Sequence, residues 1–149
     1  MPAGSQPTFL RPNLTPVPTM IRADSGPENY LTFVTNGEFT LPSDTTADKG
    51  GGNRGFRPHE LLEAALASCM AMSLRMAAQQ AGIPLGEVSV NVSLNRNGPS
   101  GPTFDYSVAF PATVAPADRA TLLAALDSCP VRRTLSRPLH FNPHPTHQR

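Results

Sequence analysis

Two cysteines are the residues of this chain whose chemistry is most distinctive. Cys69 and Cys129 are the only thiols among its 149 residues, and they stand 60 residues apart. Two thiols do not make the dense disulfide framework of a small secreted domain, so we expect them to be buried, catalytic or redox-active.

The local sequence treats the two thiols differently. Cys69 has uncharged neighbours in a long helical segment, which is equally the setting of a small buried apolar side chain. Cys129 precedes Pro130, a residue typical of the first position of a helix, and Arg132 and Arg133 follow. Amide donors at a helix N-terminus and positive charge favour a thiolate, so the local sequence alone indicates Cys129 as the more acidic thiol.

Patterns in the N-terminal part predict an arm, a hairpin and a loop. Five prolines in residues 1–18 exclude a continuous helix and predict an extended arm, followed by one domain over 19–149. Two runs rich in Thr, Phe and Val between Asn29 and Leu41 flank Asn36-Gly37, which predicts a β-hairpin closed by a type I′ turn. Residues 42–58 contain four glycines and no periodicity, so we expect a long flexible loop.

Patterns in the C-terminal part predict one long helix, a second hairpin and two shorter helical segments. Residues 58–81 begin with proline, contain only helix-compatible residues and end before Gly82, a natural helix terminator. Apolar and polar residues alternate over 88–95 and again over 104–110, which is the pattern of a hairpin with one face in water. The remaining expected elements are a helix over 116–126, a helical turn over 129–136 and a closing strand over 139–141.

These elements indicate an α+β protein in which antiparallel strands cover an apolar helix. Both faces of the helix at 58–81 are apolar, since one stripe contains Leu62 and Leu66 and another contains Leu61 and Leu74. One sheet cannot cover both faces of a helix. We therefore expect a second subunit to cover the other face.

Composition limits the classes of function. The formal charge is +1, from 12 Lys+Arg against 11 Asp+Glu, so there is no excess of positive charge for binding nucleic acid. No secretory signal is visible near the N-terminus, so we expect a cytoplasmic protein. The nearly uncharged stretch at 64–74 has 11 residues, too few to predict a membrane span. His140, His144 and His147 lie in a proline-broken tail, so we expect no metal site.

Two segments resemble a known family. GGNRGFRPHELLEAALASCMAMSLRMAAQQAG, at residues 51–82, resembles the first-cysteine helix of the OsmC/Ohr family of thiol peroxidases. DSCPVRRTLS, at residues 127–136, resembles the segment that carries the family's second cysteine, and both motifs stand in the family's order and spacing. The resemblance implies an OsmC-like fold, with antiparallel sheets packed around two long central helices of an intertwined homodimer and with active sites at the subunit interface.

The resemblance also implies a chemistry. Members of the family reduce hydrogen peroxide or organic hydroperoxides in oxidative stress defence, with electrons from a dithiol and with no metal, haem or flavin. Carried over by position, Cys69 is the peroxidatic thiolate that becomes a sulfenic acid, and Cys129 condenses with it to a disulfide. This assignment reverses the local argument, because an interface site can receive charge from the loop at 50–57 or from the partner chain.

The family's better-studied branches place two more residues beside the thiolate, a Glu ten residues before the first cysteine and an Arg from the N-terminal region. In this chain that Glu position is His59, and Glu60 lies one residue later, about half a turn round the helix from Cys69. Glu60 is equally suited to stabilise the positive end of the helix dipole. The chain is most similar to the OsmC-like branch that keeps both cysteines without this acidic residue. The resemblance gives the catalytic candidates Cys69, Cys129, Glu60 and Arg22, with Arg54 or Arg57 as alternative arginines, and the substrate-binding candidates His59, Arg57 and Met72.

Two other functions fit the same sequence. A non-enzymatic dimer could bind a small apolar ligand in an interfacial cavity, with the thiols serving only as packing. A thiol redox sensor could form the Cys69–Cys129 disulfide and change its binding to a partner without turnover. The two thiols favour chemistry over packing, and the distance between their sulfur atoms is the observation that discriminates best.

Overall fold

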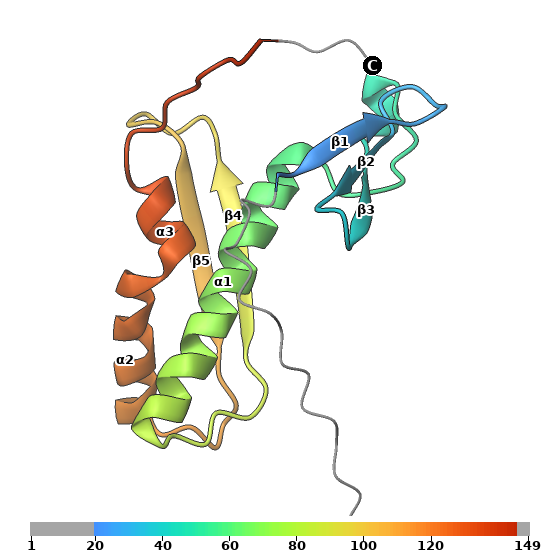
Figure 1. The fold of residues 1–149 in the computed structure, drawn as a ribbon. Helices are drawn as coiled ribbons and strands as arrows, with labels where there is room; N and C mark the ends of the chain where they lie inside the picture. Colours follow the sequence, from blue (N-terminus) through green and yellow to red (C-terminus); the bar gives the residue numbers. More distant parts are fainter. Residues whose placement is uncertain (1–19, 146–149) are drawn as a thin grey trace, which may run out of the picture. The chain divides into compact units, whose positions relative to one another are not determined.

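The computed structural model describes residues 20–145, and Figure 1 shows its helices and strands in chain order. Helices and antiparallel strands are both present, which confirms the α+β class. The chain divides into two compact units, Met1–Arg57 and Pro58–Arg149, and each is described by itself. The extended arm expected at 1–18 lies outside the described residues, and the boundaries of one domain at 19–149 remain a prediction.

The first unit contains a three-stranded antiparallel sheet. β1 (Arg22–Ser25), β2 (Thr32–Thr35) and β3 (Thr40–Ser43) lie in that order, so each strand pairs with the next. β2 consists of Thr, Phe and Val, residues that fit a pleated and half-buried strand. The predicted hairpin is confirmed, with Phe33 of β2 opposite Pro42 of β3.

The turn of this hairpin is not the type I′ turn predicted from Asn36-Gly37. Thr35 pairs with Thr40, so a loop of four residues closes the hairpin instead of two. A type I′ turn needs a positive φ at both central residues, and Gly37 has a φ of 93° whereas Asn36 does not take a positive φ. The Asn36 side chain stabilises the wider loop, because its Oδ1 accepts the backbone N–H of Phe39 at 2.7 Å.

The loop after β3 is organised around a buried carboxylate, which corrects the flexible loop expected at 42–58. Asp44 is 3% exposed. Its carboxylate accepts three backbone N–H groups from across the loop, those of Thr45 (2.7 Å), Gly52 (3.0 Å) and Arg54 (3.2 Å). A short 3₁₀ turn, η1 (Ala47–Lys49), lies between them. Glycine is required at the close approach, because a Cβ on Gly51 would lie 2.2 Å from the carbonyl oxygen of Thr45.

Asp44→Asn should destabilise the first unit and make its stability less sensitive to acid. Burial raises the pKa of Asp44, but the three backbone donors together hold it below the ordinary value of a carboxylate. A carboxylate with a lowered pKa stabilises the fold above its unfolded-state pKa, and this stabilisation is lost as the pH falls through the folded-state pKa. Urea unfolding at several pH values measures the effect, and the wild type should lose more stability on acidification than the variant. Equal losses in the two proteins would contradict this role.

The second unit is organised around one long helix. α1 (Pro58–Ala81) has 24 residues and ends before Gly82, whose φ of 66° is the left-handed conformation that terminates many helices. These bounds confirm the predicted helix. By length and hydropathy alone α1 meets the criterion for a membrane span, and its buried residues are equally those of a core helix. The expectation of no membrane span therefore remains a prediction.

A hairpin and short helical segments follow α1 in the second unit. β4 (Ser89–Asn95) and β5 (Thr103–Ala109) pair antiparallel along their whole length, with their apolar side chains alternating as predicted. The next segments are α2 (Pro116–Ala125), η2 (Leu126–Ser128) and α3 (Pro130–Leu135). The second hairpin and both helical segments predicted from the sequence are thus confirmed.

The closing strand expected at 139–141 is wrong. Residues 138–145 contain no strand in the described chain. Pro138 and Pro143 have no backbone N–H to donate to a sheet, and Leu139 and Phe141 are 55% and 92% exposed. An apolar run between prolines was therefore not sufficient evidence for a strand.

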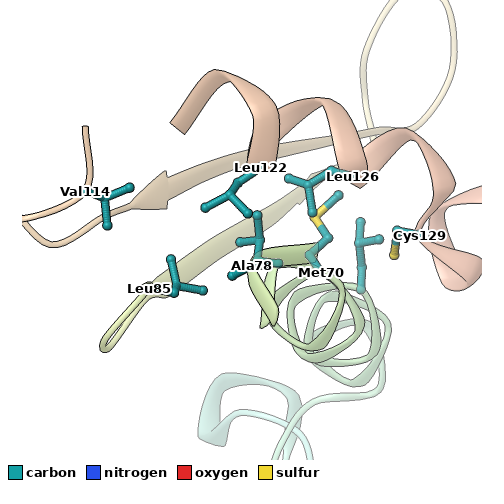
Figure 2. Packing of buried hydrophobic residues seen from close by; sticks show 9 residues of the cluster. Met70, Ala78, Leu85, Val114, Leu122, Leu126 and Cys129 are labelled. Carbon is teal, nitrogen blue, oxygen red and sulfur yellow. The ribbon is translucent and has the colours of Figure 1, made fainter. Parts of the chain in front are cut away.

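The core of the second unit gathers α1, the β4–β5 hairpin and α2 around one apolar cluster (Figure 2). From α1 the buried side chains recur every fourth residue, which places them on one face of the helix. The fully buried or nearly buried members are Leu66, Met70, Leu74, Ala78, Leu85, Val114, Leu122, Leu126 and Cys129. One of the two thiols is thus part of the core.

The opposite face of α1 is apolar but exposed in the single chain. Leu62 is 44% exposed, Met72 61% and Met76 59%. The predicted division into two faces is wrong, because Leu66 and Leu74, which the sequence analysis placed on different faces, are buried together on one face. Apolar side chains nevertheless lie on both the buried and the exposed side of the helix. Three large apolar side chains along one helix face form a surface that a second protein chain could cover.

Candidate functional site

The two cysteine side chains meet although they are distant in sequence. Cys69 lies in the middle of α1, and Cys129 lies between η2 and α3. The Cys129 thiol donates a hydrogen bond to Cys69 Sγ, and the two sulfur atoms are 3.2 Å apart. The predicted proximity is confirmed. A disulfide needs the sulfurs at about 2.05 Å, so a movement of little more than about 1 Å would join them.

The two thiols differ in exposure. Cys129 is 0% exposed, and Figure 2 shows its sulfur at one end of the apolar cluster. Cys69 is only partly buried and packs against the same cluster. Of the two sulfurs, Cys69 is therefore the one that a reagent from solution can reach first.

The electrostatics of Cys69 depend on its buried surroundings and on the start of α3. Burial raises the pKa of the Cys69 thiol above its ordinary value, and the adjacent Cys129 sulfur adds to this increase. The backbone N–H of Val131 and the hydroxyl of Ser73 donate to the Cys69 sulfur and act in the opposite direction. Cys129 occupies the N-cap position of α3 as predicted, but its side chain makes no capping hydrogen bond. The sequence analysis expected the amide groups at the start of α3 to stabilise a thiolate on Cys129. One of these groups, the N–H of Val131, instead donates to the sulfur of Cys69.

Arg132, three residues after Cys129, is held by two neighbouring side chains. Its Nη1 donates to Asp127 Oδ1 at 2.5 Å, and its guanidinium carbon lies 6.0 Å from the centre of the Tyr106 ring. The hydrogen bond to Asp127 is the main cause that raises the pKa of Arg132, and burial acts in the opposite direction. Arg132 thus holds a positive charge in the first turn after Cys129.

A groove of about 270 Å³ lies beside α1 and α3. It is lined by Leu66, Met70, Pro102, Thr103, Phe104, Tyr106, Arg132, Leu135 and Ser136. Its walls are mainly apolar, with one guanidinium among them, so they would favour an apolar group over a strongly hydrated one. Met72, predicted to bind substrate, does not line this groove and is exposed on α1.

His59 and Glu60, the two site candidates in the first turn of α1, lie far from Cys69 along the helix. Because α1 is continuous, the nine residues from Glu60 to Cys69 turn the side chain by about half a revolution and separate the two by about 13.5 Å along the axis. His59 is exposed and lies about 15 Å along the axis from Cys69. The site roles of Glu60 and His59 remain predictions.

The arginine candidates belong to the first unit. Arg22 in β1 donates a hydrogen bond to Asp24 at 2.8 Å, and Arg54 forms an ion pair with Glu28. Arg57 is the last residue of that unit and is exposed. Which of these three arginines serves the thiolate remains a prediction.

Sequence reasoning missed three residues of the second unit. Tyr106 and Asp127 position Arg132, and Glu63 Oε1 accepts the backbone N–H of Leu94 at 2.7 Å, which ties α1 to β4. A charged residue in the middle of an apolar helix was a usable signal for Glu63. No local signal was available for Asp127 and Tyr106, because the five-residue spacing between Asp127 and Arg132 crosses a helix boundary.

The absence of a metal site at the histidines of the tail remains a prediction. Among residues 20–145, no three His, Cys, Asp or Glu side chains gather closely enough to hold a metal ion. His140 and His144 lie in the segment that follows α3, and His147 lies outside the described residues.

A family model described as OsmC-like protein matches residues 50–144, which is well over half of the chain and includes both cysteines. The chain belongs to the OsmC family. The resemblance of its two cysteine segments to this family is confirmed, and so is the OsmC-like fold. The dimeric arrangement of that fold remains a prediction, because the structure contains one chain.

Solved structures of OsmC-like proteins share this fold. The organic hydroperoxide resistance protein OsmC from Legionella pneumophila has a TM-score of 0.59 and 22% identity, covering 83% of this chain and 92% of that one. An OsmC-like protein from Mycoplasma pneumoniae has a TM-score of 0.61 and 19% identity, covering 78% and 86%. The organic hydroperoxide resistance protein OhrB of Bacillus subtilis has a TM-score of 0.53 and 21% identity, covering 78% and 89%. A comparison with curated proteins gave no match.

Proposed function

We propose that this protein is a thiol-dependent peroxidase that reduces hydroperoxides with electrons from a dithiol, through Cys69 and Cys129. The observation that carries the proposal is the 3.2 Å between the two sulfur atoms. The sulfurs come from separate elements, so their meeting depends on the tertiary fold. Membership of a family that includes organic hydroperoxide resistance proteins supports the same reaction class.

The proposed reaction oxidises Cys69 and then joins it to Cys129. The Cys69 thiolate attacks the distal oxygen of the hydroperoxide, the O–O bond breaks, and the alkoxide that leaves takes a proton from solvent. Cys69 is then a sulfenic acid. The Cys129 thiolate attacks its sulfur, forms the S–S bond and releases hydroxide, which becomes water on protonation. A dithiol reductant returns both thiols to the reduced state and leaves as its own disulfide.

Organic hydroperoxides fit the site better than hydrogen peroxide. Neither cysteine lines the groove beside α1 and α3, but its walls include Leu66, Phe104 and Leu135, which can bury an apolar substituent. Burial of such a substituent contributes about 25 cal/mol per Å² of apolar surface, and hydrogen peroxide has none to bury. We therefore expect a lower KM for an organic hydroperoxide than for hydrogen peroxide.

The Cys69 thiolate needs a further positive charge beside it. Burial raises the pKa of Cys69, so the residue has less thiolate at neutral pH than a free cysteine. On the resemblance to the family, we propose Arg22 as the residue that supplies this charge, with Arg54 and Arg57 as alternatives, and Glu60 as the carboxylate that orients it. The arginine belongs either to the same chain or to a second subunit.

We also propose a homodimer, assembled through the exposed face of α1. Met72→Glu combined with Met76→Glu should convert the dimer to a monomer, because two carboxylates would have to be buried in an apolar interface. Sedimentation equilibrium should give twice 15.9 kDa for the wild type and 15.9 kDa for the double variant. Ala124→Glu, at an exposed position of α2, should remain dimeric. A folded wild-type protein of 15.9 kDa would exclude the dimer.

Hydroperoxide consumption in the presence of dithiothreitol tests the proposed activity. The wild type should consume many equivalents of cumene hydroperoxide per chain, and consumption should stop when the dithiol is exhausted. One equivalent consumed, with a stable disulfide and no further turnover, would indicate the redox sensor instead. Thiols that stay reduced under the same treatment would indicate the non-enzymatic ligand-binding protein.

A further inference from the structure

We propose that Arg132 is a positioning residue that makes Cys129 the leaving thiolate when the Cys69–Cys129 disulfide is reduced, so that the reductant becomes bonded to Cys69. The inference rests on the proposed function, because it concerns the disulfide which that function forms. It states which of the two sulfurs the reductant attacks. The distance between the sulfurs alone does not decide this.

The two sulfurs differ in burial, so a reductant can reach one of them more easily than the other. Thiol–disulfide exchange requires the attacking thiolate to approach one sulfur, and the rate depends on access to that sulfur. Cys129 is 0% exposed and lies in the apolar cluster with Leu126, so solvent does not reach it. Cys69 is partly buried and lies at the edge of the same cluster. In the single chain, a reductant therefore meets Cys69 first.

The placement of Arg132 supports the same direction. Cys129 is the N-cap residue of α3 and Arg132 is three residues later, a spacing that places both on the same side of the first helical turn. Asp127 and Tyr106 hold the guanidinium there. Asp127 is 78% exposed, so water weakens the effect of its negative charge, while the guanidinium side chain is 36% exposed. Arg132 thus places a positive charge in the helical turn that begins at Cys129.

The proposed exchange balances in two steps. The reductant thiolate attacks Cys69 Sγ, the Cys69–Cys129 bond breaks, and Cys129 departs with the electron pair as a thiolate. The second thiol of the reductant, after losing its proton to solvent, attacks the reductant sulfur of the mixed disulfide and releases the Cys69 thiolate. Exchange is faster when the departing thiolate is better stabilised, and this is the effect that Arg132 would supply.

The site of attack can be located directly in the wild-type protein. The Cys69–Cys129 disulfide is formed with diamide, without any hydroperoxide, and then exposed briefly to the monothiol glutathione before acid quenching. Peptide mass spectrometry should find glutathione on Cys69 and none on Cys129. Glutathione on Cys129 would overturn the proposal, and this result needs no variant to fold.

Variants of Arg132 test whether its positive charge speeds the reduction of the disulfide. Reduction of the diamide-formed disulfide by dithiothreitol should be about fivefold slower in Arg132→Met, whereas Arg132→Lys should recover most of the wild-type rate. Arg133→Met removes an exposed arginine from the same helix and should leave the rate unchanged. Equal slowing in Arg132→Lys and Arg132→Met would overturn the proposal, and so would equal slowing in Arg133→Met. Diamide forms the disulfide without any hydroperoxide. The reduction rates can therefore be compared even if the protein has no peroxidase activity.

Discussion

Cys69→Ser should lower dithiol-dependent consumption of cumene hydroperoxide by at least about a thousandfold, to the rate of the uncatalysed reaction. A serine hydroxyl cannot form a sulfenic acid, and the remaining thiol of Cys129 is 0% exposed, so it cannot replace the lost nucleophile. The residual hydroperoxide can be measured by a ferrous-iron colour assay. The circular dichroism spectrum should match the wild type, since a hydroxyl replaces a thiol at a partly buried position.

Cys129→Ser is the matched control for this experiment. The variant keeps Cys69, so it should consume one equivalent of hydroperoxide and stop at the sulfenic acid, which dimedone labels at residue 69. A label on residue 129 in Cys69→Ser, with none on residue 69 in Cys129→Ser, would reverse the two roles. The absence of a label in both variants would favour a non-enzymatic protein.

Leu122→Ala should lower the free energy of unfolding of the second unit by about 2–5 kcal/mol. Leu122 is 0% exposed and lies in the apolar cluster with Met70 and Leu126, so the truncation leaves a cavity as well as losing apolar burial. Chemical denaturation followed by circular dichroism measures the change. We also expect slower disulfide formation, because the same cluster holds Cys129 against α1.

Leu123→Ala provides the control on the same helix. Leu123 is 42% exposed, so its truncation makes the same change in helix composition with much less loss of burial. The variant should lose less than about 1 kcal/mol. Equal losses for the two leucines would show that the described packing of α2 does not carry the stability of this unit.

The elements of this fold could be predicted where the signals are local. Pro58 and Gly82 mark the ends of α1, and alternating apolar residues mark β4 and β5. Each signal involves residues that are close in sequence, so the pattern alone indicates the element. The resemblance of the two cysteine segments added the pairing of the sulfurs, which no local pattern contains.

The features that could not be predicted depend on contacts between distant residues. The loop after β3 looked unstructured from its glycines, but Asp44 organises it by collecting donors up to ten residues away. The acidity argument for Cys129 used Arg132 and the start of α3. The prediction about the amide donor was wrong, because the fold brings the N–H of Val131 to the sulfur of Cys69, which lies on α1. Which sulfur an amide donor at a helix N-terminus meets is decided by tertiary packing and not by local propensity.

The intact mass of the wild-type chain after one equivalent of cumene hydroperoxide tests the central claim most directly. Formation of the Cys69–Cys129 disulfide removes two hydrogen atoms, so the mass should fall by about 2 Da per chain with no link between chains. Dithiothreitol should restore the original mass. A chain that keeps its mass, or that gains oxygen atoms without losing the two hydrogens, would contradict a peroxidase cycle through these two sulfurs.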